Sequence, residues 1–177
     1  SITREALFSR VFDLCDENGG SLTRKQLGEV EFLGKKVRVI DVQGGIWNPG
    51  AAWPFDPPLQ ATLSINTTLS DKYRDAEIAN GLWRYDYQTG GSEGKNTKLR
   101  KAMELQLPIL WFVQLDNTKY VPYKVWVIED FPDKSFCHIA PNLSLAAVLK
   151  DISGSYTEIE KKYAIREVKQ RLHQPAF

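Results

Sequence analysis

Three side chains in one stretch of the chain have the types needed to hold a nucleobase. Tyr73 and Asp75 lie in a polar segment between two strand-like runs, and Tyr87 ends the second of these runs. A phenol ring can stack on a flat base, and a carboxylate accepts a hydrogen bond from an exocyclic amine. The stretch therefore predicts the mouth of a pocket for an unstacked base. The alternative is an ordinary hairpin with surface charges and core tyrosines.

Patterns typical of catalysis, metal binding or phosphate-binding loops are absent from the sequence. Neither histidine belongs to a paired metal-ligand motif, and Cys15 and Cys137 are far apart in the chain. Asp71, Asp75 and Asp86 could gather into an acidic cluster, but carboxylates beside Lys and Arg more often form surface ion pairs. We therefore expect no catalytic residue, no metal and no cofactor in this segment.

The charged residues almost cancel, with 23 Lys and Arg against 22 Asp and Glu and a formal net charge of +1. Any nucleic-acid binding must then come from a local basic face and not from the charge of the whole chain. A chain of 177 residues with 42% hydrophobic side chains suits a single domain with a substantial core. The cysteine usage and the lack of a long apolar run or signal-peptide region predict a reduced, cytoplasmic protein without membrane contact.

Two helices are predicted before the first strand. Thr3 can cap the first helix and Gly19-Gly20 ends it, while the run Thr23–Gln26 has the form of a capping box that opens the second. A helix, a turn and a second helix could be half of a winged-helix DNA reader. Because the second helix is short and not very basic, we interpret residues 1–30 as a helical arm that packs on the following domain.

Short strands dominate residues 31–150. The runs with strand-like composition are 32–42, 62–67, 82–87, 109–115, 120–128 and 135–140, and the first of these is predicted to be a hairpin or a bent strand. One helix interrupts them, beginning at Asn96 or Thr97 with Leu99 and Ala102 on its buried side. Several strands with one inserted helix predict an α+β fold with a curled, β-barrel-like sheet, and not alternating βαβ units.

Two other segments differ in kind from the strands. The proline-rich segment 48–58 is predicted to be a stiff surface loop. Residues 151–155 look like a linker, and the capping-box run Thr157–Glu160 opens a long basic helix that reaches about residue 174. Such a helix is usually a solvated face, and the alternative is contact with DNA.

The order of motifs from Gly45 to Ala140 resembles that of the SRA (SET and RING associated) domain, a PUA-type fold that reads 5-methylcytosine by flipping it from the duplex. The segments that carry the resemblance are Gly45-Ile46, Leu63-Ser64-Ile65, Tyr73-Arg74-Asp75, Gly81, Tyr85-Asp86-Tyr87, Asn96–Ala102, Pro108–Trp111 and Tyr123-Lys124-Val125. They cover about half of the chain. The helix at 163–174 is similar to one that ends the reading domain of bacterial SRA proteins fused to an HNH nuclease. The resemblance implies an N-terminal arm at 1–30, an SRA-like domain at 31–150, and a linker and helix at 151–177 that lead to an absent nuclease domain.

The resemblance also assigns roles to individual residues. Tyr73 and Tyr87 match the aromatic side chains that sandwich the flipped base, and Asp75 matches the carboxylate that accepts from the cytosine amine. Thr67 and Thr68 stand where the family has a small Ser-Gly-Gly segment against the modified ring position. The candidates for binding the DNA backbone are Lys72, Arg74, Arg84, Lys95, Lys98 and Arg100.

The implied partner is double-stranded DNA with 5-methyl- or 5-hydroxymethylcytosine, and this segment would target an HNH restriction endonuclease without being an enzyme itself. A homodimer is left open. One alternative is a reader of unmodified DNA sequence that flips no base. Another is a PUA-like module that binds RNA or a protein, with the N-terminal helices as the docking surface.

Overall fold

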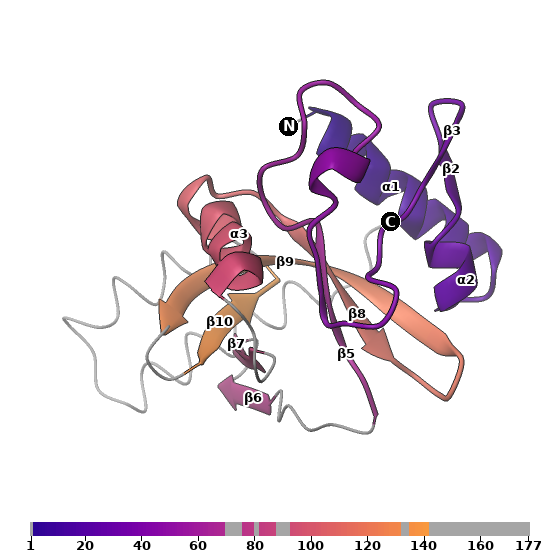
Figure 1. The fold of residues 1–177 in the computed structure, drawn as a ribbon. Coiled ribbons are helices and arrows are strands. Elements are labelled where there is room, and N and C mark those ends of the chain that lie inside the picture. Colours follow the sequence, from indigo (N-terminus) through magenta and orange to yellow (C-terminus); the bar gives the residue numbers. More distant parts are fainter. Residues whose placement is uncertain (1, 70–75, 80–81, 88–92, 132–134, 142–177) are drawn as a thin grey trace.

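The computed structural model describes residues 2–69, 76–79, 82–87, 93–131 and 135–141 (Figure 1). Within these residues the helices are α1 (Ile2–Glu17), α2 (Arg24–Leu27) and α3 (Glu93–Glu104), with a 3-10 turn at Gly50–Ala52. The strands are β1 (Leu22–Thr23), β2 (Val30–Phe32), β3 (Lys35–Val37), β4 (Ile46–Trp47), β5 (Ser64–Thr67), β6 (Ala76–Ala79), β7 (Leu82–Asp86), β8 (Ile109–Gln114), β9 (Lys119–Phe131) and β10 (Phe136–Ala140). The linker and helix predicted at 151–177 lie outside the described residues.

The described strands form one mixed sheet and one separate hairpin. The sheet order is β4-β5-β8-β9-β10-β7-β6, and β1 pairs with the start of β9. β5 and β8 run parallel, whereas the other neighbours in the sheet are antiparallel. β2 and β3 form the hairpin. Helices combined with a mixed sheet of this kind confirm the predicted α+β class.

β8 is apolar along most of its length because both of its faces are covered. Leu110 and Phe112 belong to a core shared with α1 and the β2–β3 hairpin. Ile109 and Trp111 belong to a second core shared with α3. Successive side chains of a strand point to opposite faces, so one strand serves both cores. The predicted central strand at 109–115 is therefore confirmed.

Side chains of β7 reach strands that are distant in the sheet order. The rings of Trp83 and Trp111 lie 5.2 Å apart, although β9 and β10 stand between β7 and β8. The Tyr85 hydroxyl donates to the carbonyl oxygen of Gly45, just before β4, at 2.9 Å. The faces of these strands therefore meet across the second core.

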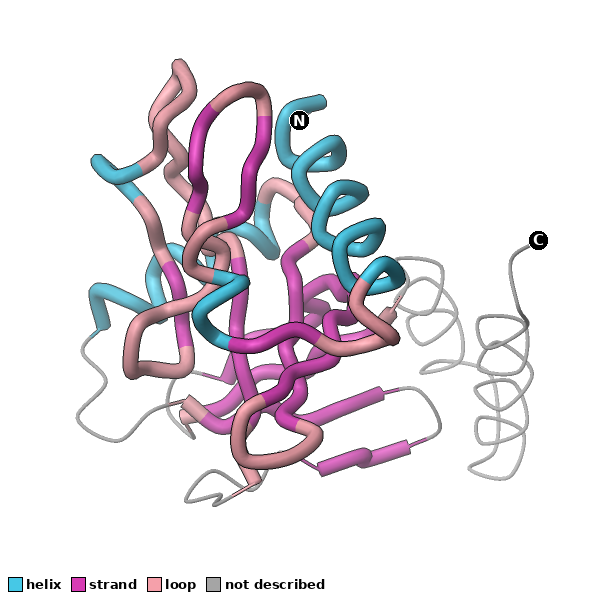
Figure 2. Tube along the Cα trace, turned by 90° about the vertical axis from the view of Figure 1, so that its right-hand side faces the viewer, coloured by secondary structure: helices cyan, strands magenta, loops and turns pink. Residues whose placement is uncertain are grey.

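α1 is joined to the sheet by Arg4, whose side chain is almost fully buried. Its guanidinium donates to the carbonyl oxygens of Thr62 at 2.9 Å, Pro108 at 2.7 Å and Ala61 at 3.2 Å. Burial lowers the pKa of Arg4 to about 10, and the three backbone acceptors offset the loss of water. Figure 2 shows α1 above the strands of the main sheet, on the same side as the β2–β3 hairpin. The N-terminal helix thus shares a core with the sheet.

The capping box at the start of α2 is confirmed. The Gln26 N–H donates to Thr23 Oγ1 at 3.1 Å, and the Gln26 side chain accepts from the Thr23 N–H at 2.8 Å. The hairpin, one of the two predictions for residues 32–42, is confirmed, but it starts at Val30 and ends at Val37. It ends there because the Val39 N–H turns to donate to the Leu27 carbonyl oxygen at 2.8 Å.

Two elements extend beyond their predicted ends. α3 begins at Glu93, earlier than the predicted start at Asn96 or Thr97. β9 continues to Phe131, past the predicted end at 128, because β10 pairs with its last residues. None of the described helices combines the length and the apolar character needed to cross a membrane.

Candidate nucleic-acid interface

The structure describes part of the predicted site. Tyr73, Asp75, Lys72 and Arg74 lie outside the described residues, and Lys95 is described only as a member of α3. The predicted residues whose side chains are described are Thr67, Thr68, Arg84, Tyr87, Lys98 and Arg100.

Tyr87 is a core side chain directly after β7. Only 5% of the residue is exposed, and its hydroxyl donates to the carboxylate of Asp130. Burial raises the pKa of Tyr87, and Cys137 and Asp130 raise it further. The packing is that of the core tyrosine which the sequence left as the alternative. A stacking role for Tyr87 stays a prediction and would require the ring to leave this packing.

Asp130 joins Tyr87 to α3. Its side chain is 5% exposed and accepts from Arg100 Nε at 2.6 Å through the second carboxylate oxygen. Asp130 raises the pKa of Arg100, whose side chain remains 41% exposed. A guanidinium that is held from one side and open on another is suited to binding phosphate. Asp130 was not predicted from the sequence, because its position opposite Cys137 depends on the β9–β10 register.

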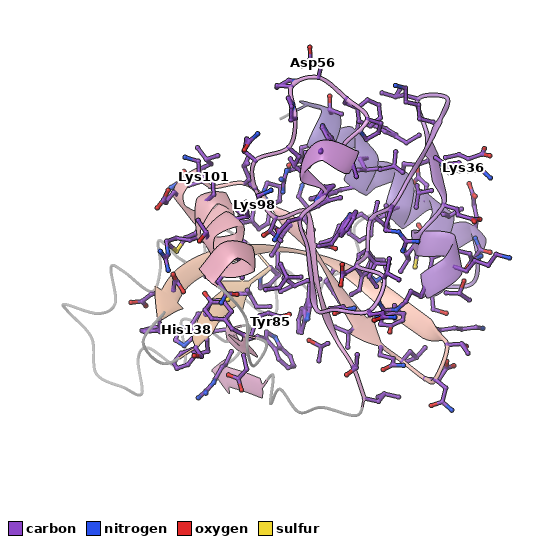
Figure 3. All side chains as sticks on the ribbon, in the orientation of Figure 1. Lys36, Asp56, Tyr85, Lys98, Lys101 and His138 are labelled. Carbon is purple, nitrogen blue, oxygen red and sulfur yellow. The ribbon has the colours of Figure 1, made fainter. Side chains whose placement is uncertain are left out.

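Lys98 lies on α3 but differs from Arg100 in its surroundings. The Lys98 ammonium lies beside Gly50, where an added Cβ would be 3.2 Å from Nζ. The Lys98 carbonyl oxygen accepts from the Thr62 N–H at 3.1 Å. Figure 3 shows Lys98 and Lys101 on α3, on the side of the loop that leads to β5. Lys98 and Arg100 thus place two cations on one surface helix.

Arg84 lies on the opposite face of β7 from Tyr85 and has partners of its own. Its Nε donates to Asp86 at 2.6 Å, and its Cζ lies 4.1 Å from the centre of the Phe136 ring. His138 is paired with Arg84 across β7 and β10, and its ring stacks on Phe136 at 5.6 Å. Burial lowers the pKa of His138, with Glu129 opposing that shift and Arg84 adding to it. Arg84 and Arg100 are thus held alike, since each is paired with one carboxylate at 2.6 Å while 42% and 41% of their side chains are exposed, and both remain phosphate candidates.

The Arg84–Asp86 pair also bears on the acidic cluster considered from the sequence. Asp86 forms a surface ion pair, which was the alternative interpretation. The described residues contain no group of three or more His, Cys, Asp or Glu side chains placed to hold a metal ion.

A group of aromatic side chains lies near the end of β5, which precedes Tyr73 and Asp75 in the sequence. Trp111 Nε1 donates to Thr67 Oγ1 at 2.9 Å. The Trp111 ring lies 5.2 Å from that of Trp83 and 5.8 Å from that of Tyr123. Tyr123 is 45% exposed, so the group reaches the surface. Partly exposed rings are the surfaces on which bases stack.

The sequence prediction missed these three rings. Trp83 shares the face of β7 that carries Tyr85, and Trp111 is directly opposite Tyr123 in the β8–β9 pair. The alternation within β7 could have identified Trp83 as inward-facing. The contact between Trp111 and Tyr123 needed the strand register, which the sequence does not give.

No known family model matches the chain, and no curated protein matches it. Among solved structures, the chain is similar to the SUVH5 SRA domain in complex with methylated CHH DNA, with a TM-score of 0.44 and 12% identity over 68% of this chain and 84% of that one. It is also similar to the SUVH5 SRA domain in complex with hemi-methylated CG DNA, with a TM-score of 0.42 and 13% identity over 58% of this chain and 74% of that one. Both similarities are remote.

Proposed function

We propose that the chain is an SRA-like, barrel-like reader of double-stranded DNA that binds a modified cytosine flipped out of the duplex. One observation carries the proposal. Residues from four of the SRA-type motifs form a single row across the sheet, in which Ile46 pairs with Ile65, Ile65 with Trp111, and Trp111 with Tyr123. Motifs separated along the chain are thus neighbours in space. The Tyr85 hydroxyl ties a fifth motif to Gly45 at 2.9 Å.

The chemistry proposed for the pocket depends on the loop between β5 and β6. Tyr73 stacks on the flipped base, and Asp75 accepts from its exocyclic amine. A carboxylate has no proton to donate at neutral pH, so it favours the amine of cytosine over the carbonyl oxygen of thymine. Stacking offsets part of the few kcal/mol lost when a base leaves the duplex. Arg100 and Lys98 bind the DNA backbone from α3.

The chain is proposed to act by targeting and not by catalysis. The sequence of residues 163–174 is similar to that of the helix that precedes the HNH nuclease in bacterial SRA proteins, and this similarity supports a role as the reading half of a modification-dependent restriction endonuclease. The proposed modification is 5-methyl- or 5-hydroxymethylcytosine. Because Thr67 and Thr68 replace the family's small residues next to that ring position, both modifications are compared in the binding test.

Equilibrium binding to matched duplexes tests the proposal. Duplexes that differ only in one cytosine, either unmodified, methylated or hydroxymethylated, are titrated at one fixed salt concentration. We expect tighter binding to a modified duplex, and a loss of that preference in Tyr73→Ala and Asp75→Ala. Glu29→Gln, at an exposed position just before β2, serves as the control that leaves the preference intact. Equal affinity for all three duplexes with no effect of the pocket variants would rule out the proposal.

A second candidate is a duplex reader that flips no base. The burial of Tyr87 favours it, because a packed ring offers no open face for stacking. A 2-aminopurine placed beside the target base distinguishes the two functions. Its fluorescence rises when its neighbour leaves the stack, and a signal that stays quenched on binding supports the second candidate.

A further inference from the structure

Leu33 combines two features that folding of the single chain does not favour. It takes the first position of the two-residue turn between β2 and β3, with a φ of 49°, and Gly34 follows with a φ of 76°. Such turns prefer Asn, Asp or Gly at that position, because the Cβ of other residues is strained there. The Leu33 residue is also 71% exposed. Strain without burial indicates that the side chain gains its contacts outside the chain.

The hairpin that carries Leu33 is held firmly at its base. Val30 and Val37 face each other in the pairing and are both buried. Phe32 packs edge-on against Phe55 with the ring centres 5.5 Å apart. Arg10 Nε, from α1, donates to the Glu31 carbonyl oxygen at 3.2 Å. The turn is therefore presented in a fixed direction, which limits the entropy lost on binding.

A hollow of about 480 Å³ lies beside the turn, lined by Arg10 and by hairpin residues 31–36. Since one water occupies about 30 Å³, this space is wide enough for an apolar side chain. The projecting leucine and the hollow that could receive such a side chain are therefore adjacent on one surface.

The same surface carries both signs of charge. Lys35 and Lys36 are exposed beside the turn, and Lys36 points outward from the hairpin in Figure 3. Asp13 and Asp16 are exposed near the end of α1, which packs beside the hairpin, and Glu17 there pairs with Arg10 at 3.7 Å. Duplex DNA would require a surface of one sign, whereas a surface with adjacent patches of opposite sign is complementary to itself.

We propose that the β2–β3 hairpin and the end of α1 form a two-fold symmetric contact with a second copy of this chain. A two-fold axis beside the turn sets each Leu33 against the hollow of the other copy. It also brings each Lys36 toward the acidic end of the other α1. In a contact of this type one surface supplies both the projection and the recess, as the hairpin does here. The contact is independent of the proposed DNA-reading function.

Sedimentation velocity of the 177-residue chain over a range of concentrations tests this contact. One chain has a mass of 20.2 kDa, and we expect a concentration-dependent species of twice that mass. Leu33→Asn removes the apolar group while suiting the turn. It should raise the dimer dissociation constant about 100-fold, since each of two leucines contributes about tenfold. Leu115→Asn is the matched control, because Leu115 is 60% exposed at another turn and should leave the dimer unchanged.

The outcomes are distinguishable. A chain that is monomeric at every concentration overturns the proposal, and so does a dimer that Leu33→Asn leaves intact. An assembly that keeps growing beyond the dimer overturns the two-fold form. Lys36→Glu leaves the turn residues unchanged and should also weaken the dimer, which keeps the test decisive if Leu33→Asn affects folding. Added salt should weaken the dimer of the unchanged chain by screening the charge pairs.

Discussion

Replacing Asp130 by alanine tests the link between the sheet and α3. The change removes a carboxylate that accepts from the Tyr87 hydroxyl and from Arg100 Nε. The two donors differ in whether water can replace the lost carboxylate. Arg100 is 41% exposed and can turn to water. Tyr87 is 5% exposed, so inside the core its hydroxyl keeps only the weak hydrogen bond with the Cys137 side chain.

The expected cost follows mainly from Tyr87. A buried polar group left without a partner costs about 1–3 kcal/mol, and a hydrogen bond to a charged acceptor is worth about 1.5–3 kcal/mol. We therefore expect Asp130→Ala to lower the free energy of unfolding by about 2–3 kcal/mol. In Tyr87→Phe with Asp130→Ala the Tyr87 hydroxyl is gone as well. That double variant should be about 1 kcal/mol more stable than Asp130→Ala alone.

Urea unfolding followed by tryptophan fluorescence measures these free energies. Glu129→Ala is the matched control, because Glu129 is the exposed neighbour on β9 and its loss should change stability by about 0.5 kcal/mol or less. If Asp130→Ala unfolds like the control, Asp130 does not hold Tyr87 in the core as described. The same conclusion follows if removing the Tyr87 hydroxyl from the Asp130→Ala variant lowers stability further.

Three further predictions concern pH, the N-terminal helix and DNA binding. Folding raises the pKa of Tyr87, whereas an unfolded tyrosine loses its proton near pH 10, so the free energy of unfolding should fall as the pH rises above about 10. Urea titrations of Tyr87→Phe should show a smaller decrease of the free energy of unfolding over the same pH range. Arg4→Met leaves the carbonyl oxygens of Thr62 and Pro108 without their donor, so thermal and urea unfolding should report a loss of about 3 kcal/mol or more. Arg100→Gln should weaken DNA binding equally for all sequences. In titrations across salt concentrations, the slope of the logarithm of the binding constant against the logarithm of the salt concentration should be smaller in magnitude by about 0.9.

Signals that depend on neighbours in the sequence predicted much of the fold. The apolar run of β8, the capping box at Thr23 and the buried Leu99 and Ala102 of α3 all follow from local pattern. In each case the physical cause lies within one turn of helix or one strand. The α+β class follows from adding these elements in order.

Features that depend on pairing between distant segments could not be predicted. Arg4 looks like an ordinary charged residue on a surface helix, yet it is buried because three carbonyl oxygens converge on it from two strand-entry segments. The parallel pairing of β5 with β8 has no local signal, since β6, β7 and α3 lie between them in the chain. The bounds of the hairpin predicted within 32–42 were misplaced for the same reason, because the Val39 N–H donates to Leu27 and the hairpin ends at Val37.

The same distinction between local signals and long-range pairing applies to the candidate site. Its residue types were visible in the sequence, but the partners of those residues were not. The Asp130 carboxylate and the group of Trp83, Trp111 and Tyr123 depend on strand register and on the packing of the second core. Tyr87 illustrates the limit of residue type alone, because its ring is packed and its hydroxyl is engaged by Asp130.

The central claim is that Asp75 recognises the amine of a flipped cytosine. The most direct measurement compares two duplexes that carry either 5-methylcytosine or thymine opposite the same guanine, because within the two rings only the groups at positions 3 and 4 differ. We predict that the chain prefers 5-methylcytosine by about tenfold or more, although the mismatched thymine is easier to flip. Asp75→Asn, which can donate to the thymine carbonyl oxygen, should remove that preference. Equal binding of the two duplexes, or a preference that survives Asp75→Asn, would contradict the claim.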